Sequence, residues 1–117
     1  MYTTVLVSDA KCERLNRLLG KVGTVLTPSS EEECLGVLER GGADFAVVVQ
    51  SEDGRGVAFA LKCAAVSDAT VVFVPVRVLP GMLLDKLTAG GVCVMPSPED
   101  EGACELFFGQ LTAIRAA

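Results

Sequence analysis

Acidic residues at the ends of apolar segments are the first candidates for chemistry in this sequence. Asp9 lies two residues beyond the apolar segment 3–7, where a carboxylate can bind a cation or cap a helix. Glu52 and Asp53 follow another apolar segment and could complete a cation site with Asp9. Acidic residues beside glycine also form turns, and helix capping by Asp9 and a turn at residues 51–56 are the simpler interpretations.

Nucleophilic chemistry is restricted by the absence of histidine from the chain. Histidine is the usual general base, so activation of a serine or cysteine by histidine is excluded within this chain. The chain has no Cys-x-x-Cys pair. Its five cysteines are Cys12, Cys34, Cys63, Cys93 and Cys104. Their apolar surroundings predict buried thiols in a reducing compartment rather than a disulfide framework.

Charge and hydropathy exclude two classes of partner. The net charge is -5 and the ten basic residues are scattered, which argues against binding to nucleic acid. The apolar runs are shorter than the roughly 20 residues of a membrane helix, and the amino terminus lacks the pattern of a signal peptide. We therefore expect a cytoplasmic protein without a membrane partner.

The elements that position these residues alternate along the chain. We expect strands over residues 3–7, 24–26, 44–50, 70–76 and 92–95. The third is apolar without interruption, as expected of a central strand that is covered on both faces.

Helix signals separate the five strands. Leu15, Leu18, Leu19 and Val22 recur at helical spacing in the first interval. Ser30 and Glu33 have the spacing of a capping box, and Pro80 suits a first helical position. Ser97 and Pro98 predict the beginning of the last helix.

Units of about 22 residues leave a doubly wound parallel sheet as the expected architecture, with residues 1–117 forming a single domain. Ligand sites of such sheets lie beyond the carboxyl ends of the strands, where the strand order reverses. The residues at these ends are Ser8, Asp9, Val49, Gln50, Ser51, Pro75, Val76, Met95 and Pro96.

The whole chain resembles the receiver domains of two-component response regulators. The likeness rests on the order of elements, the acid in VLVSDAK, the strand ADFAVVV and the ending of the fifth strand in VMPSP. It implies an α/β protein with a flavodoxin-like three-layer sandwich and the strand order 2-1-3-4-5. It also implies a role in bacterial signal transduction.

Receivers accept a phosphoryl group with an acidic pair that binds magnesium, an aspartate, a hydroxyl and a lysine. The matching residues here are Ser8 and Asp9 for the acidic pair, Val49 or Gln50 for the aspartate, Pro75 or Val76 for the hydroxyl, and Met95 for the lysine. Only Asp9 keeps the chemistry. The resemblance therefore implies a pseudo-receiver that cannot be phosphorylated, has no catalytic activity and needs no cofactor or metal.

If the chain is neither phosphorylated nor catalytic, we expect it to function through contacts with other proteins. Receivers commonly use the fourth helix, the fifth strand and the fifth helix for contacts with a protein partner or a second copy. Here we expect Phe108 to lie about 100° from a buried stripe formed by Leu106, Phe107 and Ile114. Exposed apolar residues mark interfaces. Met82, Phe108 and Leu111 are therefore candidate partner contacts, with completion of the core as the alternative.

Two alternatives to the pseudo-receiver involve a chemical reaction or a bound ligand. The first is a small phosphocarrier or enzyme that resembles the IIB proteins of the phosphotransferase system and uses Cys12. Cys12 lies four residues beyond Ser8 and lacks the glycines of a phosphate-binding loop, so a structural cysteine is the preferred interpretation. The second is a metal-binding receiver that uses Asp9. The sequence is compatible with a stand-alone protein and with one module of a longer protein.

Overall fold

Five parallel strands form one sheet at the centre of the molecule. The computed structural model describes residues 2–8, 13–51, 55–95 and 99–116. Within these ranges the strands are β1 (Tyr2–Val7), β2 (Gly23–Leu26), β3 (Phe45–Val49), β4 (Thr70–Val74) and β5 (Cys93–Val94). They lie in the order β2-β1-β3-β4-β5, which confirms the predicted doubly wound sheet.

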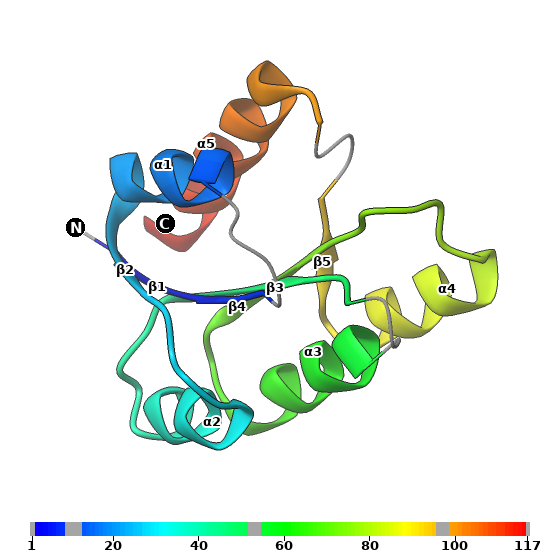
Figure 1. Cartoon of the computed structure of the whole chain (residues 1–117), viewed down its shortest axis with the longest axis horizontal. Coiled ribbons are helices and arrows are strands. Elements are labelled where there is room, and N and C mark those ends of the chain that lie inside the picture. The colour runs from blue at the N-terminus through cyan, green and yellow to red at the C-terminus, as the bar shows by residue number, and fades with distance from the viewer. Residues whose placement is uncertain (1, 9–12, 52–54, 96–98, 117) are drawn as a thin grey trace.

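Helices cover both faces of this sheet (Figure 1). The helices are α1 (Glu13–Val22), α2 (Glu31–Glu39), α3 (Arg55–Val66), α4 (Gly81–Ala89) and α5 (Glu101–Ala116). α1 and α5 lie on one face, and α2, α3 and α4 lie on the other. The chain thus forms the predicted three-layer sandwich.

The central strand β3 separates two apolar clusters. All five of its residues are buried, in agreement with its uninterrupted apolar sequence. Val48 belongs to the cluster beneath α2 and α3, whereas Val47 and Val49 belong to the cluster with α1 and α5. The last residue of β3 therefore faces the same side of the sheet as α1 and α5.

The rotation of α5 differs from the expectation. Phe108 is only 2 % exposed and packs with Cys104 and Leu111, so the expectation that it is exposed is wrong. Leu106 and Ile114, expected in the buried stripe, are 66 % and 72 % exposed. Apolar residues occur on several sides of α5, so their spacing did not determine which side packs against the sheet.

Helix α5 also begins later than expected, at Glu101. The Asp100 carboxylate accepts a hydrogen bond from the Ala103 amide at 3.1 Å and so caps the helix. The expected capping residues Ser97 and Pro98 lie outside the described residues.

Helix α2 begins with the predicted cap, in a modified form. The Ser30 hydroxyl accepts a hydrogen bond from the Glu33 amide at 3.1 Å. The Glu33 carboxylate, however, accepts from Ser29, at 2.6 Å from its hydroxyl and 3.3 Å from its amide, and not from the amide of the cap residue. These hydrogen bonds stabilise the charged form and lower the pKa of Glu33 below its ordinary value.

The Ser29→Ala substitution is therefore expected to raise the pKa of Glu33 towards its ordinary value, because the hydroxyl donor is lost. A carboxylate with a lowered pKa stabilises the fold above its unfolded pKa, and this contribution disappears as pH falls through the folded pKa. An NMR titration of the Glu33 side chain measures the change. Ser67→Ala is the control, because the Ser67 hydroxyl hydrogen-bonds to Cys63 and Ala69 and not to Glu33. Identical Glu33 titrations in the two variants would contradict the assignment.

Candidate functional site

The carboxyl ends of β1 and β3 lie side by side in the sheet. The chain continues from β1 to α1 on one face and from β3 to α3 on the opposite face (Figure 1). This point is the topological switch of a doubly wound sheet, where ligands bind in such folds. Two clefts open here, and Val49 lines both of them.

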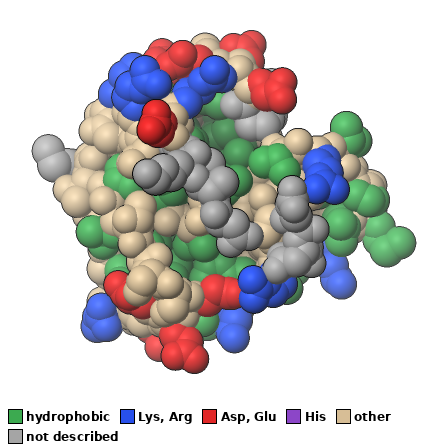
Figure 2. Space-filling model, viewed as in Figure 1, with side chains coloured by type: hydrophobic (Ala, Val, Ile, Leu, Met, Phe, Trp, Pro, Cys, Tyr) green, Lys and Arg blue, Asp and Glu red, His purple; other side chains and the backbone are tan. Residues whose placement is uncertain are grey.

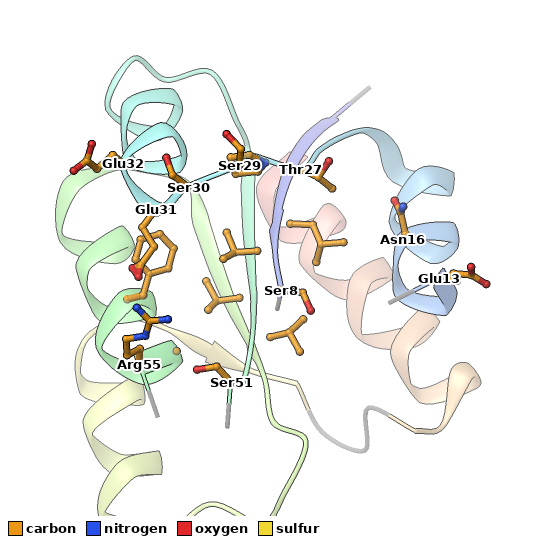
Figure 3. A pocket seen from close by; sticks show the side chains of 17 residues that line it. Ser8, Glu13, Asn16, Thr27, Ser29, Ser30, Glu31, Glu32, Ser51 and Arg55 are labelled. Atoms are coloured by element: carbon orange, nitrogen blue, oxygen red, sulfur yellow. The ribbon is translucent and has the colours of Figure 1, made fainter. Parts of the chain in front are cut away.

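The first, which we call the hydroxyl cleft, has a volume of about 930 Å³. Its floor is apolar and includes Leu6, Val48 and Phe59. Its walls carry hydroxyl groups from the end of β1, the loop before α2 and the end of β3 (Figure 3): Ser8, Thr27, Ser29, Ser30 and Ser51. The charged residues at this cleft are Glu13, Glu31, Glu32 and Arg55. Among the described residues, three acidic side chains and one basic side chain line this cleft, so their charge does not favour an anion.

The second, which we call the apolar cleft, has a volume of about 1010 Å³. It lies over the carboxyl ends of β3, β4 and β5, beside α1 and the start of α5. Its apolar lining is Leu15, Leu18, Val49, Val74, Pro75, Val76, Val78, Met95 and Cys104. The structure thus brings together four of the strand-end residues that the sequence singled out, Val49, Pro75, Val76 and Met95.

The floor of the apolar cleft is packed and nonpolar. Val49 is 8 % exposed and Met95 is 1 % exposed. The Met95 amide donates to the Phe73 carbonyl at 2.9 Å, and the Met95 sulfur accepts from the Cys104 thiol at 3.5 Å. The side chains of Val49, Pro75 and Met95 that meet at this edge of the sheet are thus an isopropyl group, a pyrrolidine ring and a thioether, none of which carries a charge or a hydroxyl.

Gln50 has a structural role that the sequence did not reveal. Its side-chain oxygen accepts hydrogen bonds from the amides of Val76 at 2.8 Å and Arg77 at 3.2 Å. The backbone amide of Gln50 donates to the Val74 carbonyl at 2.9 Å. The side chain therefore links the end of β3 to the turn that follows β4.

Several predicted site residues lie outside the described part of the chain: Asp9, Cys12, Glu52, Asp53 and Pro96. Ser8, at the end of β1, is half-buried and lines the hydroxyl cleft. Among the described residues, the acidic and cysteine side chains form no cluster of three or more that could hold a metal ion.

The described cysteines are free and form no disulfide with one another. Cys34, Cys63 and Cys104 are buried, as the sequence predicted, and Cys93 is half-buried. Contact with the Cys34 thiol, together with burial, raises the pKa of Cys63. Burial and the Asp100 carboxylate raise the pKa of Cys104. A raised pKa leaves little thiolate at neutral pH, so Cys63 and Cys104 are poor nucleophiles.

The candidate partner contacts have different surroundings. Met82 on α4 is 81 % exposed, Leu111 is half-buried, and Phe108 is buried, which rules out direct contact by the Phe108 side chain in this conformation. Sequence reasoning missed Val78, which is 97 % exposed, and did not recognise the exposure of Val76, which is 56 % exposed. No local pattern marked this exposure, because alternation of Val76 and Val78 with Arg77 is equally typical of valines that face the core.

Comparisons with known proteins agree on the fold. No family model and no curated protein matches this sequence. The chemotaxis protein CheY4 of Vibrio cholerae is similar in structure, with a TM-score of 0.73, 14% identity and coverage of 94% of this chain and 98% of that chain. A two-component response regulator from Clostridium difficile has a TM-score of 0.74 and 19% identity and covers 99% and 97% of the two chains.

A putative pilus assembly-related protein from Burkholderia pseudomallei has a TM-score of 0.72 and 20% identity, with coverage of 97% of this chain and 90% of that chain. These likenesses show that the chain has the receiver fold, as its sequence predicted. Within the described residues, none of the helices has the length and apolar character needed to span a bilayer.

Proposed function

We propose that this chain is a pseudo-receiver, a signalling module that acts through protein contacts and does not accept a phosphoryl group. The observation that carries the proposal is the apolar cleft at the carboxyl ends of β3, β4 and β5. Val49, Pro75 and Met95 meet there. A dianionic phosphoryl group needs a metal and cationic or hydroxyl groups to spread its charge, and these three side chains supply none.

The partner in this proposal is a protein, either a different protein or a second copy of the chain. Exposed apolar side chains on α4 and α5 support a protein partner. They are Met82, Leu106 and Ile114, whereas the earlier candidate Phe108 is buried. The net charge of -5 opposes nucleic acid as the partner. The free state of the described cysteines is consistent with the cytoplasm as the compartment.

Incubation with acetyl phosphate and magnesium, and separately with beryllofluoride and magnesium, tests the loss of phosphorylation. We expect an unchanged intact mass and an unchanged melting temperature, because the phosphoacceptor and its supporting groups are replaced. The DrrB receiver domain, a structural neighbour described as BeF3-activated, is the positive control for the beryllofluoride experiment. A covalent phosphoryl adduct or stabilisation by beryllofluoride would refute the proposal.

Variants at the two remaining reactive positions separate the alternatives. An adduct that disappears in Cys12→Ser would support a phosphocarrier. Stabilisation by magnesium alone that disappears in Asp9→Asn would support a metal-binding receiver.

A further inference from the structure

Exposed apolar side chains concentrate beside the apolar cleft. Val76, Val78, Met82 and Leu84 occur in one stretch of nine residues, from the turn after β4 into α4. Figure 2 shows hydrophobic side chains at this edge of the molecule, where Figure 1 places the turn and α4. Val76 and Val78 also line the apolar cleft. The exposed stretch therefore adjoins the cleft through Val76 and Val78, and we call the cleft and this stretch together the cleft surface.

Hydrogen bonds and packing fix this stretch in place. The Gln50 side chain holds the Val76 and Arg77 amides. Leu79, directly after the exposed Val78, is 7 % exposed and belongs to the apolar cluster beneath α2 and α3. Because the turn is anchored on both sides of Val78, the exposure of this side chain belongs to an ordered segment. An ordered, exposed apolar surface beside an apolar cleft is typical of an interaction site.

Charge around the cleft selects the kind of partner. Among the described residues, four acidic ones line it, Glu13, Glu99, Asp100 and Glu101, against two basic ones, Arg14 and Arg77. The Arg14 guanidinium already donates to the Glu99 carbonyl at 3.0 Å. A second copy of this chain would bring a similar acidic rim and the same net charge of -5 to the contact. Like charges across an interface are unfavourable, so a basic partner fits better than a second copy.

The length of the sheet edge indicates whether the partner binds as a strand or as a helix. Strand addition needs a free edge long enough for several main-chain hydrogen bonds. The edge strand nearest the cleft, β5, has only two residues. A helix that lays its apolar face into a groove needs no such edge.

We propose that the cleft surface binds a basic amphipathic helix of another protein. Its apolar side chains would contact Val76, Val78 and Met82 and enter the cleft above Val49 and Met95. Its lysines or arginines would face the acidic start of α5, Glu99, Asp100 and Glu101. This inference rests on the proposed function and names the class of partner.

Fluorescence anisotropy with two labelled helical peptides tests the proposal. One peptide carries leucine on one face and lysine on the other, and the second replaces each lysine by glutamate. We expect the lysine peptide to bind and the glutamate peptide to bind at least about tenfold more weakly, which corresponds to about 1.4 kcal/mol. Binding of the lysine peptide should also weaken as salt is raised. Equal binding of both peptides, or no binding of either, would overturn the proposal.

Matched variants separate the cleft surface from general attraction to an acidic protein. Val78→Asp and Ile114→Asp each add one negative charge at an exposed apolar position, and Ile114 lies on α5 outside the cleft lining. We expect Val78→Asp to weaken binding by about tenfold or more and Ile114→Asp to leave it within about twofold. An equal effect of the two variants would refute the site. Co-sedimentation with anionic vesicles that Val78→Asp abolishes would assign this surface to a membrane and also overturn the proposal.

The phosphorylation experiment keeps the two proposals distinguishable. A phosphoryl adduct would reject the pseudo-receiver whatever the peptides do. Absence of an adduct together with absence of peptide binding would reject the helix-binding surface alone.

Discussion

Replacing Phe108 by alanine is expected to lower the free energy of unfolding by about 3–5 kcal/mol. Phe108 is 2 % exposed and belongs to the cluster that packs α5 against the sheet. Its ring also contacts Phe107 edge to face, with 5.7 Å between the ring centroids. Alanine would lose these contacts and leave a cavity between α5 and the sheet. Urea denaturation followed by circular dichroism measures the loss.

Ile114→Ala on the same helix is the control for that measurement. Ile114 is 72 % exposed, so its truncation should change the free energy of unfolding by no more than about 0.5 kcal/mol. Comparable losses in the two variants would mean that α5 packs in a different rotation. A stable Phe108→Ala protein would restore Phe108 as a candidate partner contact.

Val49→Asp is expected to destabilise the protein by about 3–5 kcal/mol at neutral pH without making it phosphorylatable. Val49 is 8 % exposed, so the carboxylate would lie among Leu18, Val74 and Met95 at the apolar cleft. Burial raises the folded pKa of such an aspartate above its unfolded value. The variant should therefore be most stable below the unfolded pKa and lose stability as pH rises through the folded pKa.

Urea denaturation at several pH values, together with incubation with acetyl phosphate and magnesium, measures both effects. Val49→Thr, which has nearly the same shape and no charge, should show a smaller loss that does not depend on pH. Pro75 and Met95 still lack the hydroxyl and the cation, so no covalent adduct is expected in either variant. A phosphorylated Val49→Asp protein would show that these two positions do not prevent the reaction.

Most of the fold could be predicted because local and long-range signals agree. β3 is apolar without interruption and is buried on both faces. Parallel strands need crossover helices, so the alternation of strands and helices left few possible topologies. The rotation of α5 could not be predicted in the same way. Several sides of this helix are apolar, and only packing against the neighbouring strands and α1 selects the side of Phe108.

The meeting of Val49, Pro75 and Met95 was predictable, because the carboxyl ends of parallel strands lie at one edge of the sheet. The hydrogen bonds of Gln50 were not. They depend on the path of the chain after β4, which no local pattern determines. The exposure of Val78 was hidden for a similar reason, since an apolar residue beyond a strand has the same sequence pattern whether it is buried or exposed.

The Gln50 amide has a consequence for how such a module could carry information. The turn after β4 is held by a permanent side chain of the protein itself, with hydrogen bonds of 2.8 and 3.2 Å. Reversible phosphorylation would give that turn two states. The side-chain amide of Gln50 is always present and so favours one state as soon as the chain folds. Under the proposed function, the signal would then depend on abundance: synthesis and degradation of this protein or its partner would set the output.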